Sequence, residues 1–218
     1  MILAISQRVV ENPTYRDRRD ALSQDWAITF ARHMPEAVLV PVPNCLANVA
    51  AWLGAVQPRG IILSGGNDWG TAPDRDATET ALFDFAQQRD IPLLGVCRGL
   101  QVIHKLTGGE IEPSIAAATG TSHTAVQHGI HLAAGPFRDI ARQDEICVNS
   151  YHDQGVLLSS GLSADLEVFA TAGDGVEGFV HRSRPVLAIQ WHPERDGSPS
   201  DFDFAIIRKL FSQGAFWL

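Results

Sequence analysis

Short apolar runs alternate with amphipathic stretches through the first half of the chain. The apolar runs predict four strands, at residues 2–5, 37–41, 60–63 and 91–96. The stretches between them have apolar residues at helical spacing, and they predict helices at residues 18–32, 46–53, 76–89 and 99–106. Strand–helix alternation of this kind is typical of a doubly wound, flavodoxin-like α/β fold, in which helices cover both faces of a mostly parallel sheet.

The second half of the chain has a different pattern. Between residues 111 and 189 the apolar runs are short, rich in β-branched residues and separated by Gly, Asp and Asn. Strands are predicted at residues 166–170, 176–181 and 186–190, partly antiparallel, and a closing amphipathic helix at residues 201–211. Because no repeat or long linker divides the chain, we expect a single domain over residues 1–218 with a β-rich C-terminal elaboration.

Composition narrows the class of protein. With 45% hydrophobic and 19% charged residues, the 218-residue chain has the composition of a globular protein rather than a disordered one. Its 25 acidic against 17 basic residues give a net charge of −8, which disfavours nucleic acid and anionic membranes as partners. Three cysteines without a CxxC pair, and no basic region before an apolar core at the N-terminus, predict a cytoplasmic protein.

Cys97 stands between Gly95 and Gly99, where an apolar run ends and a predicted helix begins. This is the G-x-nucleophile-x-G arrangement of a nucleophile elbow, whose flanking glycines leave room for a sharp turn. The N-terminus of the helix would favour the thiolate form of the cysteine. The alternative is a buried cysteine that fills a tight strand–helix junction.

His192 and Glu194 follow another apolar run, with Pro193 between them. In an extended chain, residues two apart point to the same side, so the carboxylate can orient the imidazole and stabilise its protonated form. The alternative is a surface ion pair at a strand end.

The turn Ser64-Gly65-Gly66 follows the predicted strand at residues 60–63. The backbone N–H groups of Gly66 and Arg98 could form an oxyanion hole beside Cys97, although a plain glycine turn is the alternative. No GK[ST] follows this turn and the chain lacks GxGxxG, which argues against the usual nucleotide-binding loops.

Together, Gly-Val-Cys-Arg-Gly-Leu-Gln, the upstream Ser-Gly-Gly and the downstream Trp-His-Pro-Glu resemble the class I glutamine amidotransferase-like hydrolases. The chain is most similar to their gamma-glutamyl hydrolase branch, through Arg75, Asp76 and Glu79 and through the stretch 148–152. The resemblance implies a Cys97–His192–Glu194 triad that hydrolyses a gamma-glutamyl amide through a thioester. It implies no metal and no organic cofactor.

The same resemblance suggests residues that hold the glutamyl end of the substrate: Gln101, Asn149, Ser150 and Tyr151. Gln101 lies about one helical turn after Cys97, so both can face one pocket. Its neutral amide can donate to and accept from a zwitterionic amino acid.

The leaving group is a separate question, and the long loop after the first strand bears on it. Arg8, Arg16 and Arg19 in this loop could bind a phosphate, because guanidinium groups contact phosphates bidentately. The alternative places the later arginines at a solvated helix start, paired with Asp17 and Asp20. This pattern and Arg195 resemble the bacterial hydrolases of gamma-glutamyl-CDP-amidate, which act in capsule phosphoramidate synthesis.

Other functions stay open at this stage. They are a gamma-glutamyl-gamma-aminobutyrate hydrolase, a glutaminase subunit that delivers ammonia to a partner synthetase, and a non-enzymatic binding module. We expect a small-molecule partner and leave a homodimer open. A metal site at His123, His128 and His131 is disfavoured against ordinary histidines, and Cys45 and Cys147 are predicted to be buried.

Overall fold

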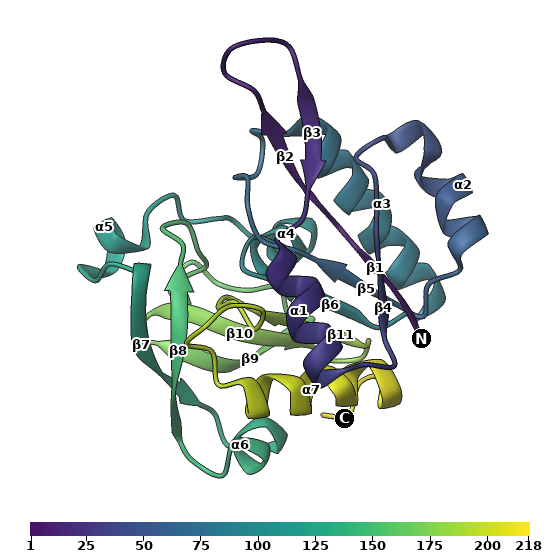
Figure 1. Ribbon diagram of the computed structural model, residues 1–218. Coiled ribbons are helices and arrows are strands. Elements are labelled where there is room, and N and C mark those ends of the chain that lie inside the picture. Colours follow the sequence, from purple (N-terminus) through teal and green to yellow (C-terminus); the bar gives the residue numbers. More distant parts are fainter.

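The computed structural model describes residues 1–218, apart from the side chain of Leu46. Its main sheet has nine strands in the described residues (Figure 1), in the order β4-β1-β5-β6-β11-β10-β9-β7-β8. The first five strands of that order are mutually parallel: β4 (Val38–Pro41), β1 (Ile2–Ile5), β5 (Gly60–Leu63), β6 (Leu93–Val96) and β11 (Val186–Ile189). The remaining strands pair antiparallel: β10 (Gly175–His181), β9 (Leu166–Ala172), β7 (Thr124–Leu132) and β8 (Glu145–Tyr151).

Helices cover both faces of this sheet (Figure 1). One face packs on α1 (Gln24–His33), α6 (Pro136–Ala141) and α7 (Ser200–Gln213), and the other packs on α2 (Leu46–Val56), α3 (Pro73–Arg89) and α4 (Arg98–Leu106). Alternate strand residues serve the two faces: Leu3 and Ile5 join the first core cluster and Ala4 the second. Because the central strands are buried on both faces, they are apolar throughout, and this is why they appear as apolar runs in the sequence. The predicted doubly wound fold is confirmed.

The prediction of a helix over residues 18–32 is wrong in its first part. Residues Arg18–Ala21 form strand β3, which pairs with β2 (Arg8–Glu11) in a hairpin that projects from the body (Figure 1). The side chain of Asn67 fixes the hairpin to the turn after β5: it accepts from Val9 N–H at 2.7 Å and donates to Val9 O at 3.0 Å. Helix α1 begins only after its N-cap Ser23, and its Trp26 and Phe30 are buried as expected.

Two cysteines also differ from expectation. Cys45 and Cys147 are exposed, although both were predicted to be buried. Cys147 lies on β8, the last strand of the sheet, where alternate residues face outward. Cys97 is the buried one. Among the described helices, none has both the length and the apolar character required to cross a membrane.

Candidate active site

Cys97 occupies a strained turn between β6 and α4. Its backbone has φ +52° and ψ −105°, a region that non-glycine residues rarely adopt. A Cβ atom at Gly99 would lie 2.1 Å from the carbonyl oxygen of Leu63, and one at Gly95 would lie 2.6 Å from Cδ1 of Ile103. Only glycine fits on either side of the cysteine, so the geometry of a nucleophile elbow is present.

Strand β11 brings His192 to this turn. It pairs with β6 in parallel, and the N–H of Cys97 donates to Ile189 O at 2.8 Å. Beyond the strand end, Nδ1 of His192 lies 2.8 Å from Oε1 of Glu194. The second ring nitrogen is not engaged by Glu194 and is left for Cys97. All three side chains predicted from the sequence therefore meet at one place.

The charges around His192 determine its protonation. Burial by itself would lower the pKa of His192, but the anionic Cys97 and Glu194, with their hydrogen bonds, raise that pKa to about 10. At neutral pH the ring is therefore protonated, between the side chains of Cys97 and Glu194. This is the state in which a histidine can give a proton to a leaving group.

The loop that carries His192 is held by Asn149. The side-chain oxygen of Asn149 accepts from His192 N–H at 2.9 Å, and its NH₂ group donates to the carbonyl oxygens of His192 (2.9 Å), Arg195 (3.3 Å) and Asp196 (3.1 Å). Ser150 donates to His123 O at 2.6 Å and is also buried. Both side chains were predicted to bind substrate; the structure engages them with the backbone instead, which indicates a positioning role.

Tyr151 remains beside the catalytic candidates. It is 44% exposed, and its ring stands edge-on to His192 with 5.8 Å between centroids. The guanidinium of Arg195 lies over the same tyrosine ring at 4.6 Å. Gln101 is nearly buried, and its NH₂ group donates to Gln154 O at 2.8 Å, so it links α4 to the segment after β8.

The glycine turn after β5 closes the third side of the site. A Cβ at Gly65 would lie 2.8 Å from Cε1 of His192 and 3.6 Å from Cβ of Cys97, so this backbone touches both residues. Gly66 has φ +94°, a conformation that favours glycine. Arg98 is the first residue of α4, where a backbone N–H has no acceptor within its own helix. The two predicted oxyanion-hole donors, the N–H groups of Gly66 and Arg98, therefore lie in the turn after β5 and at the start of α4, next to Cys97.

Arg75 shapes this turn, a role that the sequence analysis did not assign. The buried guanidinium donates to three successive carbonyl oxygens, those of Ser64 (2.7 Å), Gly65 (3.0 Å) and Gly66 (2.9 Å). In a trans peptide the C=O and the next N–H point in opposite directions. Because the Gly65 carbonyl faces Arg75, the N–H of Gly66 faces away from it.

Glu79 holds the guanidinium of Arg75 in place. Its Oε1 accepts from Nε of Arg75 at 2.9 Å and from the hydroxyl of Ser6 at 2.7 Å, and it also pairs with the Arg98 side chain. The i, i+4 spacing of Arg75 and Glu79 could have indicated this contact from the sequence, since residues four apart share one face of a helix.

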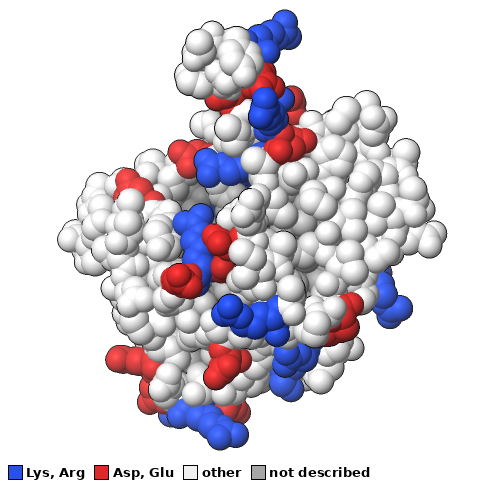
Figure 2. All heavy atoms as spheres, in the orientation of Figure 1, with Lys and Arg blue, Asp and Glu red and all other residues white. Residues whose placement is uncertain are grey.

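A cavity of about 50 Å³ lies at the base of the hairpin. It is lined by Arg8, Ala21, Leu22, Ser23, Trp26, Ser64, Gly65, Gly66, His192, Glu194 and Arg195. Figure 2 shows charged side chains of both signs along the hairpin and around the hollow below it. Of the arginines predicted to bind phosphate, Arg8 reaches the site: its side chain would lie 3.2–3.4 Å from a Cβ at Gly66.

The outer arginines are placed differently. Arg16 and Arg19 are exposed on the hairpin, and Arg19 pairs with Asp17 at 2.5 Å. Arg18 pairs with Glu11 at 3.5 Å and with Asp74 at 2.8 Å. Their expected place at a helix start is wrong, because this segment is a strand. Of the partners that the alternative interpretation named, Asp17 pairs with Arg19, whereas Asp20 accepts hydrogen bonds from Asn44.

Comparisons with known proteins bear on the family of the chain. Residues 2–194 match the family model of peptidase C26. A gamma-glutamyl-CDP-amidate hydrolase of Campylobacter jejuni is 26% identical over 219 residues, which cover 97% of this chain and 98% of that protein. A Schizosaccharomyces pombe protein described as a glutamine amidotransferase is 32% identical over 158 residues, 62% of this chain but only 61% of its own length.

A solved structure supports the fold. A Thermoplasma acidophilum protein described as one of the subunits of GMP synthase superposes with a TM-score of 0.67 over 97% of this chain and 92% of that one, at 19% identity. That identity bears on the fold alone. The family model, in contrast, extends from the first strand to Glu194. The chain therefore belongs to the peptidase C26 family, among the class I glutamine amidotransferase-like proteins.

Proposed function

We propose that this protein is a cysteine hydrolase that cleaves a gamma-glutamyl amide and releases glutamate, with gamma-glutamyl-CDP-amidate as its substrate. The observation that carries the reaction class is the strained Cys97 turn, with His192 packed against the same glycine backbone and its Nδ1 2.8 Å from Oε1 of Glu194. The near full-length similarity to the Campylobacter hydrolase supports the substrate, which would place the reaction in capsule phosphoramidate synthesis.

The reaction would proceed through a thioester. The Cys97 thiolate attacks the gamma-carbonyl carbon, and the N–H groups of Gly66 and Arg98 stabilise the resulting oxyanion. Protonated His192 gives its proton to the leaving nitrogen as the carbon–nitrogen bond breaks. Neutral His192 then takes a proton from water, which attacks the thioester and releases glutamate with the thiolate restored. Glu194 orients the ring and stabilises its charge throughout.

The surroundings of His192 suit a phosphorylated leaving group. Arg8 and Arg195 line the same small cavity as His192. Arg195 is only partly neutralised, since its Nε lies 3.7 Å from Glu194. A phosphoryl group bonded to the scissile nitrogen would enter next to His192, where guanidinium groups can contact it bidentately. For the glutamyl end we propose Gln101 and Tyr151.

Glutamate release from three substrates tests the proposal: gamma-glutamyl-CDP-amidate, gamma-glutamyl-gamma-aminobutyrate and glutamine. We expect the highest kcat/KM for the nucleotide-linked amide, without a second protein. Cys97→Ala should lower kcat by about 10⁴-fold or more, because no thioester can form. The matched control Cys147→Ala, at an exposed cysteine, should retain wild-type activity.

Each contrary result has a clear meaning. Near wild-type turnover by Cys97→Ala would overturn the nucleophile. Hydrolysis of glutamine alone, and only with an added synthetase, would replace the hydrolase by a glutaminase subunit. A preference for gamma-glutamyl-gamma-aminobutyrate would keep the reaction class and overturn the substrate.

A further inference from the structure

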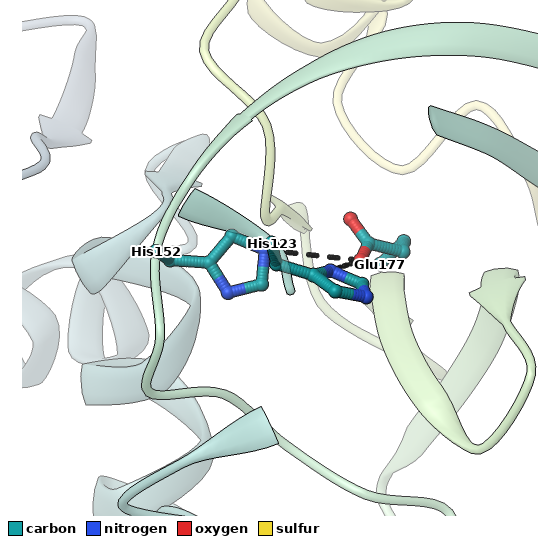
Figure 3. A group of neighbouring side chains, drawn as sticks. All are labelled: His123, His152 and Glu177. Atoms are coloured by element: carbon teal, nitrogen blue, oxygen red, sulfur yellow. Dashed lines mark ion pairs between the residues drawn. The ribbon is translucent and has the colours of Figure 1, made fainter. Parts of the chain in front are cut away.

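Three imidazoles surround one buried carboxylate in the β-rich half of the protein. Oε1 of Glu177 on β10 lies 3.3 Å from Nδ1 of His123, 3.7 Å from Nε2 of His128 and 3.8 Å from Nε2 of His152. His123 is the residue before β7, His128 lies in the middle of β7, and His152 is the residue after β8. Figure 3 shows the rings of His123 and His152 converging on the Glu177 carboxylate.

This grouping replaces the metal site considered from the sequence. His131, the third member of that trio, is exposed on β7. His152 and Glu177 take its place, and they come from other strands. The ligand atoms of His123, His152 and Glu177 all lie within 4.8 Å of one another.

The polar atoms of the cluster lack hydrogen-bond partners among the described residues. This holds for Nδ1 of His123, Nε2 of His128, Nε2 of His152 and Oε2 of Glu177, all of which are buried atoms. Buried polar groups in folded proteins are nearly always satisfied, so four such atoms at one point require a ligand or another explanation. The atoms include three ring nitrogens, which points to an electron-pair acceptor rather than to an anion.

We propose that His123, His128, His152 and Glu177 form a binding site for a divalent metal ion of the zinc type. Around tetrahedral Zn²⁺, with bonds of about 2.0–2.1 Å, neighbouring ligand atoms are separated by about 3.3–3.4 Å. The three nitrogens lie at 3.3–3.8 Å from Glu177 Oε1, which is near that separation. The ligand atoms of His123, His152 and Glu177 are within 4.8 Å of one another, and His128 would approach them to complete the coordination. Imidazole nitrogen with carboxylate oxygen is a donor set that zinc favours.

The surroundings hold two of the rings in the form that binds metal. Nδ1 of His152 lies 2.9 Å from Gln154 O, and Nδ1 of His128 lies 3.3 Å from Gly129 O. A carbonyl oxygen only accepts, so each Nδ1 carries the proton and each Nε2 offers its lone pair to the cluster.

The ion would have a structural role, because it would join three segments behind the active site. The carbonyl oxygen of Gln154 accepts from both His152 and Gln101, and Gln101 lies one turn from Cys97 on α4. A cavity of about 410 Å³, lined in part by His123, His128 and Asp174, gives an entry path to the cluster.

Metal binding is tested on chains that all carry Cys97→Ala, so that the Cys97–His192 pair cannot bind the ion. Zn²⁺ is titrated against a chromophoric chelator, and Co²⁺ is followed by its visible absorption, which is strong for tetrahedral sites. We expect one Zn²⁺ per chain and a higher Tm with the metal. His128→Asn, His152→Asn and Glu177→Gln should weaken binding by at least about 100-fold and abolish the rise in Tm.

His131→Asn is the matched control, since it removes an exposed histidine from the same strand. It should bind Zn²⁺ as tightly as its parent. The site would be overturned if His131→Asn lost as much Zn²⁺ affinity as the other variants. It would also be overturned if the parent bound Zn²⁺ no more tightly than His128→Asn and His152→Asn. If Glu177→Gln fails to fold, those two histidine variants decide, because His128 is partly exposed and circular dichroism reports their folding.

Discussion

A single methyl group at Gly65 should separate catalysis from folding in this protein. In Gly65→Ala the new Cβ would lie 2.8 Å from Cε1 of His192, whereas ordinary contacts lie at 3.4–4 Å. The ring must therefore retreat by about 0.6 Å or more, given the spacing of normal carbon contacts. It cannot retreat freely, because Glu194 holds Nδ1 and Asn149 holds the backbone.

The size of the effect follows from the geometry. A misplacement of about 1 Å in a catalytic group can lower the rate about 10²-fold. For a shift of about 0.6 Å we expect kcat/KM to fall by roughly 10- to 100-fold. The effect should lie mainly in kcat, because the ring acts on the transition state more than on the bound substrate. Thermal unfolding should still be cooperative, since only a ring shift is required.

Two assays measure the change. The first is glutamate release from a gamma-glutamyl amide. The second is the rate at which iodoacetamide alkylates Cys97, which reports the thiolate without any assumption about substrate. Alkylation is measured in a Cys45→Ala, Cys147→Ala background, because both of those thiols are exposed. We expect Gly65→Ala to slow both reactions.

The control is Gly54→Ala. Gly54 lies exposed in α2 with no atom within 4 Å of a built Cβ, so activity should not change, and stability should rise by about 1 kcal/mol through helix propensity. Wild-type rates in both assays for Gly65→Ala would refute the tight contact between this turn and His192. An equal loss in Gly54→Ala would show that the loss in Gly65→Ala does not come from the contact with His192.

Two further predictions concern charge. His192 with a pKa of about 10 should act as an acid up to that pH, so kcat/KM should fall as pH rises through about 10. Glu194→Gln removes one charge that raises the pKa of His192, so the fall in kcat/KM should move to lower pH. An unchanged pH profile would show that Glu194 does not act on the ring. Arg8→Ala should raise KM for a nucleotide-linked gamma-glutamyl amide about 10- to 150-fold, through loss of a charge-assisted hydrogen bond, and should have little effect on KM for an uncharged amide. Arg16→Ala is the control and should leave both KM values unchanged. Equal changes for both substrates in Arg8→Ala would show that Arg8 does not bind the phosphate.

Some features of this protein depend on residues that are neighbours in the chain, and those could be predicted. The sharp turn at Cys97 requires glycine at positions 95 and 99, and these residues are close enough in the chain to be recognised as one motif. His192 and Glu194 are two residues apart in an extended segment, so their contact follows from local geometry. The strands buried on both faces appear as continuous apolar runs.

Other features depend on which segments pair in space. Residues 18–21 form a strand because they pair with residues 8–11, and Asn67, far away in the chain, fixes that hairpin to the turn after β5 through Val9. The three carbonyls that Arg75 binds belong to a turn outside its own helix. Asn149 is engaged with the His192 loop because β8 ends beside it.

The histidine cluster shows the same division. The histidine trio considered from the sequence, and disfavoured there as a metal site, included His131 because it lies three residues after His128. The pairing of β7 with β8, and of β10 with β9, instead brings His152 and Glu177 to that point. The sequence indicated the parallel strands and the glycine turn around Cys97, because those depend on short stretches of chain. The tertiary structure alone decided which polar side chains meet, because strand order and register fix distances between residues that the chain keeps far apart.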